Sequence, residues 1–313
     1  MELDLGQARG AEKTKKMIKR LNCLFLATLA VLLGSPVWAQ GTVNNITTQV
    51  AKVYRPQADT IEVMSAKMGR GIKNVVVLPK QYDAGPQDER YPVLYLLHGA
   101  GGDYSNWPQK ANLEDKATHF GVIIVCPDGQ DSWYFDSPID AKMQFETYLS
   151  QELIAYIDSH YRTFAVPAMR AITGLSMGGH GALWLALRHP EVYGSCGSMS
   201  GGVDITHFPH KWKLDQRLGQ WESNGARWAQ HSVMSLVPHA KPGQNIIIDD
   251  GVDDIFYAEN CALHDALLKA GIPHDFTIRP GNHSWSYWLN SLDYHLLFFS
   301  KAFAQSSLQT KQQ

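Results

Sequence analysis

One serine of this sequence lies among glycines, in the segment "AITGLSMGGHGALWLALRHP". Ser176 is the centre of a Gly-x-Ser-x-Gly pattern that begins at Gly174 and ends at Gly178. Glycines at these places let a strand and the following helix approach closely, so that the serine can occupy a sharp, strained turn. Such a turn would raise the Ser176 hydroxyl and place the Met177 amide at a helix N-terminus, facing a developing oxyanion. The pattern alone also fits an ordinary glycine-rich turn, so the partners of the serine matter.

A nucleophilic serine needs a base, because its hydroxyl is a weak nucleophile at neutral pH, and the base must be oriented by an acid. Where the serine occupies such a strand-to-helix turn, the acid and then the histidine follow it along the chain. The segment "IRPGNHSWSYW" places His283 directly after a strand pattern. Other histidines lack this order or placement: His98, His180, His264 and His274. We therefore predict that His283 is the base.

The acid must come from a turn with several carboxylates, "IIIDDGVDDIF". Asp249 and Asp250 end the strand pattern and suit the capping of a turn. Asp254 lies past the glycine of this turn and just before a helix pattern, where its side chain could reach a neighbouring loop. This placement favours Asp254 as the acid and leaves Asp249, Asp250 and Asp253 as a solvated, turn-forming cluster.

A second oxyanion donor is expected in the loop after an earlier strand, which reads "LLHGAGGD". Its glycines would let the backbone turn N–H groups inward, and Ala100 is the predicted donor. Aromatic residues could form the walls of a substrate site, with Trp133, Tyr134 and Trp285 foremost and the insertion tryptophans Trp212, Trp221 and Trp228 beside them. These side chains could equally belong to the core.

Alternating strand and helix patterns indicate what would hold these residues in place. Strand patterns cover 60–68, 72–79, 91–99, 121–129, 168–174, 194–201, 245–251 and 274–281, and helix patterns cover 145–161 and 257–271. Several strands are continuous apolar runs, as expected where both faces of a sheet are covered. The alternation predicts an α/β fold with a mostly parallel sheet, whose ligands sit beyond the carboxyl ends of the strands. Residues 203–243 interrupt it and are predicted to form an insertion near the site.

The N-terminal segment is typical of an export signal. Basic residues precede an apolar run from Leu24 to Leu33, and Val37-Trp38-Ala39 suits cleavage after Ala39. The run is short for a bilayer span of ~20 residues, so no stable membrane insertion is expected after cleavage. A start at Met17 would give a conventional basic region, and the choice between Met1 and Met17 stays open. The predicted parts are 1–39 (extension and signal), 40–59 (lead-in), 60–305 (catalytic domain) and 306–313 (polar tail).

Composition limits the possible partners. The 313 residues are 44% hydrophobic and carry a formal net charge of -2, so neither nucleic acid nor an anionic membrane is an expected partner. "HFPH" at 207–210 is an isolated histidine pair with no obvious third ligand, so no metal site is predicted. After signal removal Cys126, Cys196 and Cys261 remain, and buried free thiols are favoured over a disulfide.

Five segments together resemble a known family: "YPVLYLLHGAGG", "PDGQDSWYFDSP", "ITGLSMGGHGAL", "DDGVDDIFYAEN" and "GNHSWSYW". They look like the putative esterase family of α/β-hydrolases, which includes esterase D (S-formylglutathione hydrolase), secreted feruloyl esterases and the antigen 85 mycolyltransferases. The resemblance spans roughly residues 60 to 303. The resemblance implies that the aspartate of the family's G-x-x-D turn is Asp254 and that the histidine of its G-x-H-x-W turn is His283. It implies an α/β-hydrolase fold and a Ser-His-Asp esterase that uses no cofactor.

The resemblance and the export signal together predict a secreted or periplasmic serine esterase. We expect a small-molecule or carbohydrate ester as substrate, with feruloyl or acetyl esters of plant polysaccharide foremost. An acyltransferase of the mycolyltransferase type, or a hydrolase of short-chain esters or of S-formylglutathione-type thioesters, is the alternative. A binding protein that has lost activity is disfavoured because all three catalytic residue types are present.

Overall fold

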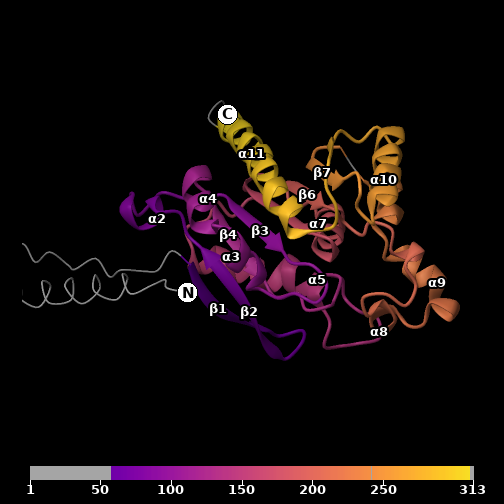
Figure 1. Ribbon diagram of the computed structural model, residues 1–313. Helices are drawn as coiled ribbons and strands as arrows, with labels where there is room; N and C mark the ends of the chain where they lie inside the picture. Colours follow the sequence, from indigo (N-terminus) through magenta and orange to yellow (C-terminus); the bar gives the residue numbers. More distant parts are fainter. Residues whose placement is uncertain (1–57, 241, 311–313) are drawn as a thin grey trace, which may run out of the picture. The chain divides into compact units, whose positions relative to one another are not determined.

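The computed structural model describes residues 58–240 and 242–310 (Figure 1). The predicted signal peptide, its cleavage site and almost all of the lead-in lie outside the described residues. A single sheet organises the described chain, with the strand order β1-β2-β4-β3-β5-β6-β7-β8. Its strands are β1 (Ala58–Ser65), β2 (Arg70–Val77), β3 (Val93–Leu97), β4 (Ile123–Pro127), β5 (Arg170–Leu175), β6 (Ser195–Met199), β7 (Asn245–Gly251) and β8 (Asp275–Arg279).

The strand directions confirm the mostly parallel sheet. β1 pairs with β2 and β2 with β4 in antiparallel fashion, whereas all the later pairings are parallel. Every residue of β3, β4, β5 and β6 is buried. These strands carry apolar or small residues on both faces. Both faces must therefore be covered by other elements, since a strand with one face in solvent would alternate polar and apolar residues. The parallel strands also bring their carboxyl ends to one edge of the sheet.

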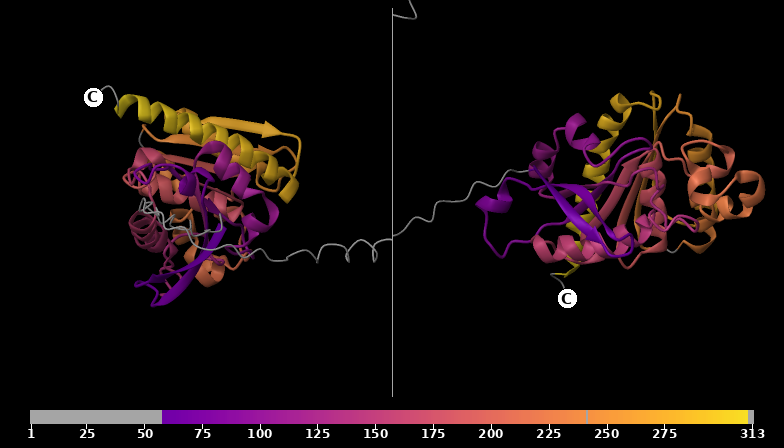
Figure 2. Two further views of the ribbon diagram at one scale, coloured as in Figure 1. Left: turned by 90° about the vertical axis from the view of Figure 1, so that its left-hand side faces the viewer. Right: turned by 90° about the horizontal axis from the view of Figure 1, so that it is seen from below.

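Helices cover both faces of this sheet. One hydrophobic cluster joins one face to α4 (Leu113–Phe120) and α11 (Trp285–Thr310), and Figure 2 shows α11 lying along that side. A second cluster joins the other face to α6 (Leu153–His160), α7 (Met177–Arg188) and α10 (Tyr257–Lys269). α11 continues through residues 306–310, which the sequence analysis assigned to a polar tail. The shorter elements are α2 (Gln81–Ala84), α3 (Asn106–Lys110) and a 3-10 turn η2 (Pro167–Met169).

The helix predicted over 145–161 is present but changes its winding. It consists of α5 (Phe145–Thr147), a π-helical segment η1 (Tyr148–Glu152) and then α6. The buried tyrosines at this place anchor the wider turn, because Tyr148 exchanges hydrogen bonds with Asn74 and the hydroxyl of Tyr193 donates to the Leu149 carbonyl at 2.7 Å. Periodicity alone does not reveal such a local change in winding.

The insertion predicted over 203–243 lies between β6 and β7. It contains η3 (Ile205–His207), α8 (Leu214–Leu218), α9 (Trp221–Gln230) and η4 (Val233–His239), and Figure 1 shows α8 and α9 to one side of the sheet. Trp228 is fully buried and its indole N–H donates to the Gly219 carbonyl at 2.9 Å. The buried apolar side chains of the insertion belong to the same hydrophobic cluster as the sheet and α7, so the insertion packs onto the main core.

The cysteines of the described chain are free, and Cys126 and Cys196 are buried in strands β4 and β6. Burial raises the pKa of the Cys196 thiol to about 12 and raises that of Cys126 further. Cys261 is partly exposed on α10. Within residues 58–240 and 242–310, no helix is both long and apolar enough to cross a membrane.

Candidate active site

Ser176 occupies a sharp turn between β5 and α7. Its backbone has φ 57° and ψ −118°, which a non-glycine residue adopts only under strain, and α7 begins at the next residue. The surrounding glycines are required by close contacts. A Cβ on Gly178 would lie 2.6 Å from the His98 carbonyl oxygen, and one on Gly174 would lie 2.7 Å from the Gly178 carbonyl oxygen. The strand and the helix thus approach as closely as the sequence pattern indicates.

The structure brings together Ser176, His283 and Asp254. His283 Nε2 lies 3.0 Å from Ser176 Oγ, and His283 Nδ1 lies 3.0 and 2.9 Å from the two carboxylate oxygens of Asp254. With its proton on Nδ1, the imidazole donates to Asp254 and accepts the hydrogen bond of the Ser176 hydroxyl. This is the arrangement in which a histidine can take the proton of an attacking serine.

Asp254 is held rigidly in the turn that follows β7. Its side chain is fully buried, and its Oδ1 accepts a hydrogen bond of 2.9 Å from the amide of Phe256. The His283 ring packs edge-to-face against Phe256 and against Trp288, with ring centroids 5.3 and 4.8 Å apart. These contacts fix the plane of the imidazole between the acid and the serine.

The other aspartates of this turn divide into two kinds. Asp253 is exposed, as expected of a solvated turn residue, but Asp249 and Asp250 are completely buried. The prediction of a solvated cluster is therefore wrong for these two, because they end β7, which lies between β6 and β8. Asp249 accepts hydrogen bonds from Tyr287 and Ser291 of α11, at 2.6 and 3.0 Å, and pairs with Arg279 of β8.

Asp250 lies on the opposite side of the strand and accepts hydrogen bonds from neutral donors. The Asn260 side chain donates to Oδ2 at 2.9 Å, and the amide of Gly251 donates to Oδ1 at 2.8 Å. Burial, and then the nearby charge of Asp254, raise the pKa of the Asp250 carboxyl to about 8. Asp250 is therefore largely protonated at neutral pH and does not compete for the role of the triad acid.

The loop predicted to supply the second oxyanion donor lies against the serine. A Cβ on Gly99 would lie 3.3 Å from the Cβ of Ser176, and both Gly99 and Ala100 line the same cavity as the hydroxyl. Asp131 supports the loop from behind by accepting a hydrogen bond of 2.6 Å from the Gly101 amide. The amides of Met177 and Ala100 stay the predicted oxyanion donors.

A cavity of about 490 Å³ contains Ser176 and His283, and three tryptophans line it: Trp212, Trp285 and Trp288. Of the predicted wall residues outside the insertion, Trp285 lines it. Trp133 and Tyr134 do not, since they are 1% and 0% exposed and pack in the core. The Tyr134 hydroxyl instead donates to the His98 carbonyl at 2.9 Å, which holds the oxyanion loop in place.

Two further tryptophans line the cavity. Trp288, which is not among the predicted walls, faces it from the first turns of α11. The spacing of "HSWSYW" held its signal, because residues 285 and 288 are three apart and share one face of a helix. Trp212, one of the three insertion tryptophans predicted as walls, reaches the cavity from the insertion. Trp221 and Trp228 do not line it, and Trp228 is buried in the core.

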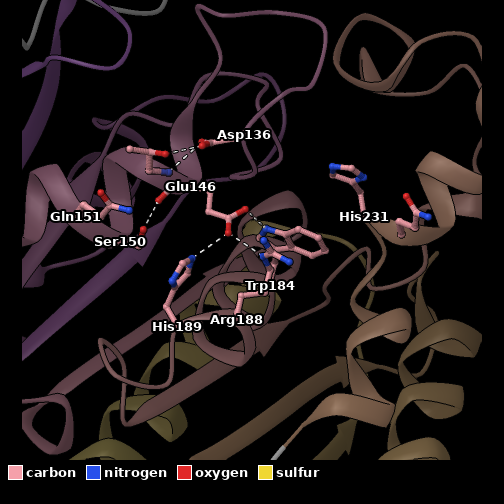
Figure 3. Close-up of a pocket in the computed structure, with 10 residues that line it drawn as sticks. Asp136, Glu146, Ser150, Gln151, Trp184, Arg188, His189 and His231 are labelled. Carbon is pink, nitrogen blue, oxygen red and sulfur yellow. Dashed lines mark hydrogen bonds and ion pairs between the residues drawn. The ribbon is translucent and has the colours of Figure 1, made fainter.

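A separate cavity of about 380 Å³ shares no lining residue with the serine's cavity (Figure 3). Glu146 is at its centre, where it accepts hydrogen bonds from Trp184 at 2.9 Å, Arg188 at 2.7 Å and His189 at 2.9 Å. Burial opposes ionisation of Glu146, but these three donors prevail and lower its pKa to about 2. Its carboxylate is already satisfied, so this cluster joins α5 to α7 rather than offering a free group to a ligand.

The remaining histidines have partners elsewhere. His98 accepts from the Gly129 amide at 2.8 Å, buried His180 lies 2.9 Å from the His231 carbonyl, and His264 and His274 contact each other. The pair in "HFPH" diverges, since His207 faces Glu259 and His210 faces Asp215 and Glu222. No group of three or more metal-ligating side chains occurs among the residues that the structure describes.

Comparison with known proteins gives the family. Residues 65–299 match the family described as putative esterase. Esterase MT1326 of Mycobacterium tuberculosis (strain CDC 1551 / Oshkosh) is 28% identical over 236 residues, which cover 66% of this chain and 51% of that protein. The chain thus spans about half the length of this curated relative.

Solved structures agree on the fold. A ferulic acid esterase superposes with a TM-score of 0.69 and 27% identity, covering 79% of this chain and 98% of that one. An S-formylglutathione hydrolase from Agrobacterium tumefaciens superposes with a TM-score of 0.67 and 24% identity, covering 79% and 95% of the two chains. Because residues 65–299 match its family model, the chain belongs to the putative esterase family. The strand order and the solved structures show that it has the α/β-hydrolase fold.

Proposed function

We propose that this protein is a serine hydrolase that cleaves carboxylic esters through Ser176, His283 and Asp254. The observation that carries the proposal is the unbroken series of contacts from the buried Asp254 carboxylate through the imidazole to the serine hydroxyl, at 2.9 and 3.0 Å. The strained backbone of Ser176 supports it, because such strain persists at functional sites where the surrounding structure enforces it.

The reaction proceeds in two steps. As Ser176 Oγ attacks the ester carbonyl, His283 Nε2 takes its proton, and Asp254 stabilises the imidazolium that forms. The amides of Met177 and Ala100 donate to the oxyanion of the tetrahedral intermediate. His283 then gives its proton to the departing alcohol, leaving an acyl group on Ser176. A water molecule, deprotonated by the same imidazole, releases the acid and restores the serine.

The finer assignment is a secreted or periplasmic carbohydrate esterase that acts on feruloyl or acetyl esters of plant polysaccharide. Three tryptophans around the catalytic serine, Trp212, Trp285 and Trp288, offer flat apolar walls for a hydroxycinnamoyl ring or a sugar face. The 27% identity to a ferulic acid esterase and the N-terminal pattern with cleavage after Ala39 support it.

Hydrolysis of methyl ferulate and acetylated xylan tests the proposal. We expect the Ser176→Ala variant to lose on the order of 10⁴- to 10⁶-fold in kcat, because the covalent step disappears while binding persists. Ser159→Ala, on the exposed side of α6, is the matched control and keeps full activity. A fluorophosphonate probe is expected to label the parent protein and not Ser176→Ala. Equal hydrolysis by the parent and Ser176→Ala would refute the proposal.

A further inference from the structure

The insertion contacts the segment that follows β4 at two points beside the active-site cavity. The indole N–H of buried Trp133 donates to the Trp212 carbonyl at 3.3 Å, and Lys213 Nζ donates to Asp131 Oδ2 at 2.6 Å. Trp212 and Lys213 both have positive φ, 48° and 61°, so the chain is held on a strained course here. Lys213 is therefore attached to a fixed part of the insertion, although its own side chain is 58% exposed.

Asp131 joins this contact to the oxyanion loop. Its Oδ1 accepts a hydrogen bond of 2.6 Å from the Gly101 amide, while its Oδ2 accepts from Lys213. Burial opposes ionisation of this carboxyl, but the hydrogen bonds from Lys213 and from the Gly101 amide prevail and lower its pKa. Asp131 is therefore charged at neutral pH. A charged acceptor binds an amide more strongly than a neutral acceptor does.

The tip of the oxyanion loop has little else to hold it. Residues 99–102 form a turn that the Gly102 amide closes by donating to the Gly99 carbonyl at 3.1 Å. Gly101, the third residue of this turn, has φ of 74° and is exposed. A Cβ on Gly101 would meet no atom of the described residues within 4 Å beyond its chain neighbours, so packing does not fix the tip. The peptide before the third residue can face either of two ways in such a turn, and the hydrogen bond to Asp131 selects one of them.

The orientation of this peptide matters because the peptide joins Gly101 to Ala100, whose own amide is the predicted second oxyanion donor. If the peptide turned over, the backbone of Ala100 would rotate with it and the turn would change its type. Oxyanion donors are effective in catalysis when they are held in position before the charge develops. Asp131 holds the peptide, and Lys213 of the insertion holds Asp131 in turn.

From these contacts we infer that the insertion supports catalysis through the oxyanion loop, with Lys213 and Asp131 as positioning residues: Lys213 holds the Asp131 carboxylate, and Asp131 holds the Gly101 peptide. The inference rests on the proposed esterase function. Neither side chain touches the reacting atoms, so the loss of either should lower kcat and leave KM nearly unchanged. The two contributions differ in size. A hydrogen bond to a charged group is worth about 10- to 100-fold, whereas an exposed ion pair is worth up to about 5-fold.

Hydrolysis of methyl ferulate by variants of these two residues tests the inference. Asp131→Ala removes the acceptor of the Gly101 amide and should lower kcat by about 10- to 100-fold, with KM within about 3-fold of the parent value. Asp131→Asn keeps an oxygen for this amide, and Lys213→Met keeps the carboxylate, so each should lower kcat by only about 2- to 5-fold. In the Asp131→Ala background Lys213→Met should have no further effect, because Lys213 acts through Asp131.

A pair of inhibitors separates oxyanion stabilisation from ordinary binding. Ser176 Oγ adds to the carbonyl carbon of an aryl trifluoromethyl ketone, its proton passes to His283, and the carbonyl oxygen becomes an oxyanion. The matching aryl methyl ketone has the same shape but a far less electrophilic carbonyl, so it binds without forming this adduct. In Asp131→Ala the inhibition constant of the trifluoromethyl ketone should rise by the factor by which kcat/KM falls, and that of the methyl ketone should not change.

Asp103→Ala is the matched control. Asp103 lines the same cavity of about 400 Å³ as Asp131, but it accepts hydrogen bonds from Ser105, so its replacement should leave kcat unchanged. An equal loss of kcat in Asp103→Ala would refute the inference, since removal of a negative charge near the site would then explain both results. Thermal unfolding of each variant checks that the fold persists.

The other outcomes separate this inference from the esterase proposal. A raised KM with unchanged kcat in Asp131→Ala would refute it, because the carboxylate would then contact the substrate. Lys213 is exposed and its replacement is tolerated by the fold, so unchanged kcat in Lys213→Met would refute the part of the insertion even where Asp131→Ala unfolds. Equal effects of Lys213→Met in the parent and in Asp131→Ala would do the same. The esterase proposal survives all these results and fails if Ser176→Ala hydrolyses the ester as fast as the parent does.

Discussion

Replacing Asp250 by asparagine should stabilise the protein, and the effect should depend on pH. Asp250 is fully buried near Asp254, and burial together with the charge of Asp254 raises the pKa of its carboxyl from the usual 3.8 to about 8. At neutral pH the folded protein must therefore keep a proton that the unfolded chain releases. Holding this proton lowers the free energy of unfolding, and an asparagine needs no proton to be neutral.

The magnitude follows from the difference between the two pKa values. Each pH unit above the unfolded pKa of 3.8 removes about 1.36 kcal/mol from stability, up to the folded pKa of about 8. At pH 7 the accumulated loss is about 4 kcal/mol. The amide offers one acceptor oxygen where the carboxyl offers two, which costs about 1 kcal/mol. Asp250→Asn should therefore raise the free energy of unfolding by roughly 2–3 kcal/mol at pH 7.

Urea unfolding of the parent and of Asp250→Asn at pH 4.5, 6 and 7.5 measures this effect. The gain should be close to zero at pH 4.5, where the accumulated loss in the parent is only about 1 kcal/mol and is offset by the cost of the missing acceptor, and it should grow at each higher pH. Asp253→Asn is the matched control, because this neighbouring aspartate is exposed and its replacement should shift the midpoint little at any pH.

A gain independent of pH would refute the reasoning, since it would show that Asp250 is ionised in the folded protein or that the asparagine acts by packing alone. A loss of stability at pH 7.5 would also refute it, because an ionised Asp250 would then be making favourable contacts. Esterase activity should survive in the variant, because Asp254 and His283 are left unchanged.

Four further substitutions probe other parts of the structure. Gly178→Ala should cost about 1–3 kcal/mol and lower kcat, measured by unfolding and ester assays, because its Cβ would meet carbonyl oxygens at the end of β3. Glu146→Gln should lower the free energy of unfolding by roughly 2–3 kcal/mol at pH 7. The pKa of Glu146 is about 2 in the folded protein and 4.5 in the unfolded chain, so the stability that its charge contributes is lost as the pH falls from about 4.5 towards 2. The difference between the variant and the parent, measured by unfolding, should disappear over that range. Trp133→Ala should lower the free energy of unfolding by about 3–5 kcal/mol, because Trp133 packs in the core. Trp285→Ala should instead raise KM with little change in melting temperature, because Trp285 lines the cavity. Equal effects of the two variants on the melting temperature would contradict this placement.

The fold was predictable because strand and helix patterns alternate along this chain with few interruptions. Continuous runs such as that of β4 indicated strands covered on both faces, and the glycines around Ser176 indicated a close strand-to-helix approach. The order of serine, aspartate and histidine, together with the placement of Asp254 past the glycine of its turn, selected Asp254 and His283 from several candidates. The structure places His283 between Ser176 and Asp254.

What the sequence could not supply was the burial of residues near the site. Asp249 and Asp250 read as solvated turn residues, because their burial depends on β8, α10 and α11, which come from later in the chain. Trp133 and Trp212 are both plausible cavity walls from the sequence, but Trp133 packs in the core whereas Trp212 lines the cavity. Aromatic type alone does not distinguish these positions, since both a core and a binding cavity favour the same side chains.

The enclosed thiols of Cys126 and Cys196 have a consequence for how an exported chain would mature. Thiol–disulfide exchange requires a thiolate, and burial leaves these two almost entirely protonated once the sheet has closed. The native fold is therefore resistant to oxidation at β4 and β6 even in an oxidising compartment. The vulnerable interval is the time before the sheet closes, when a mispaired bridge between these strands would block folding.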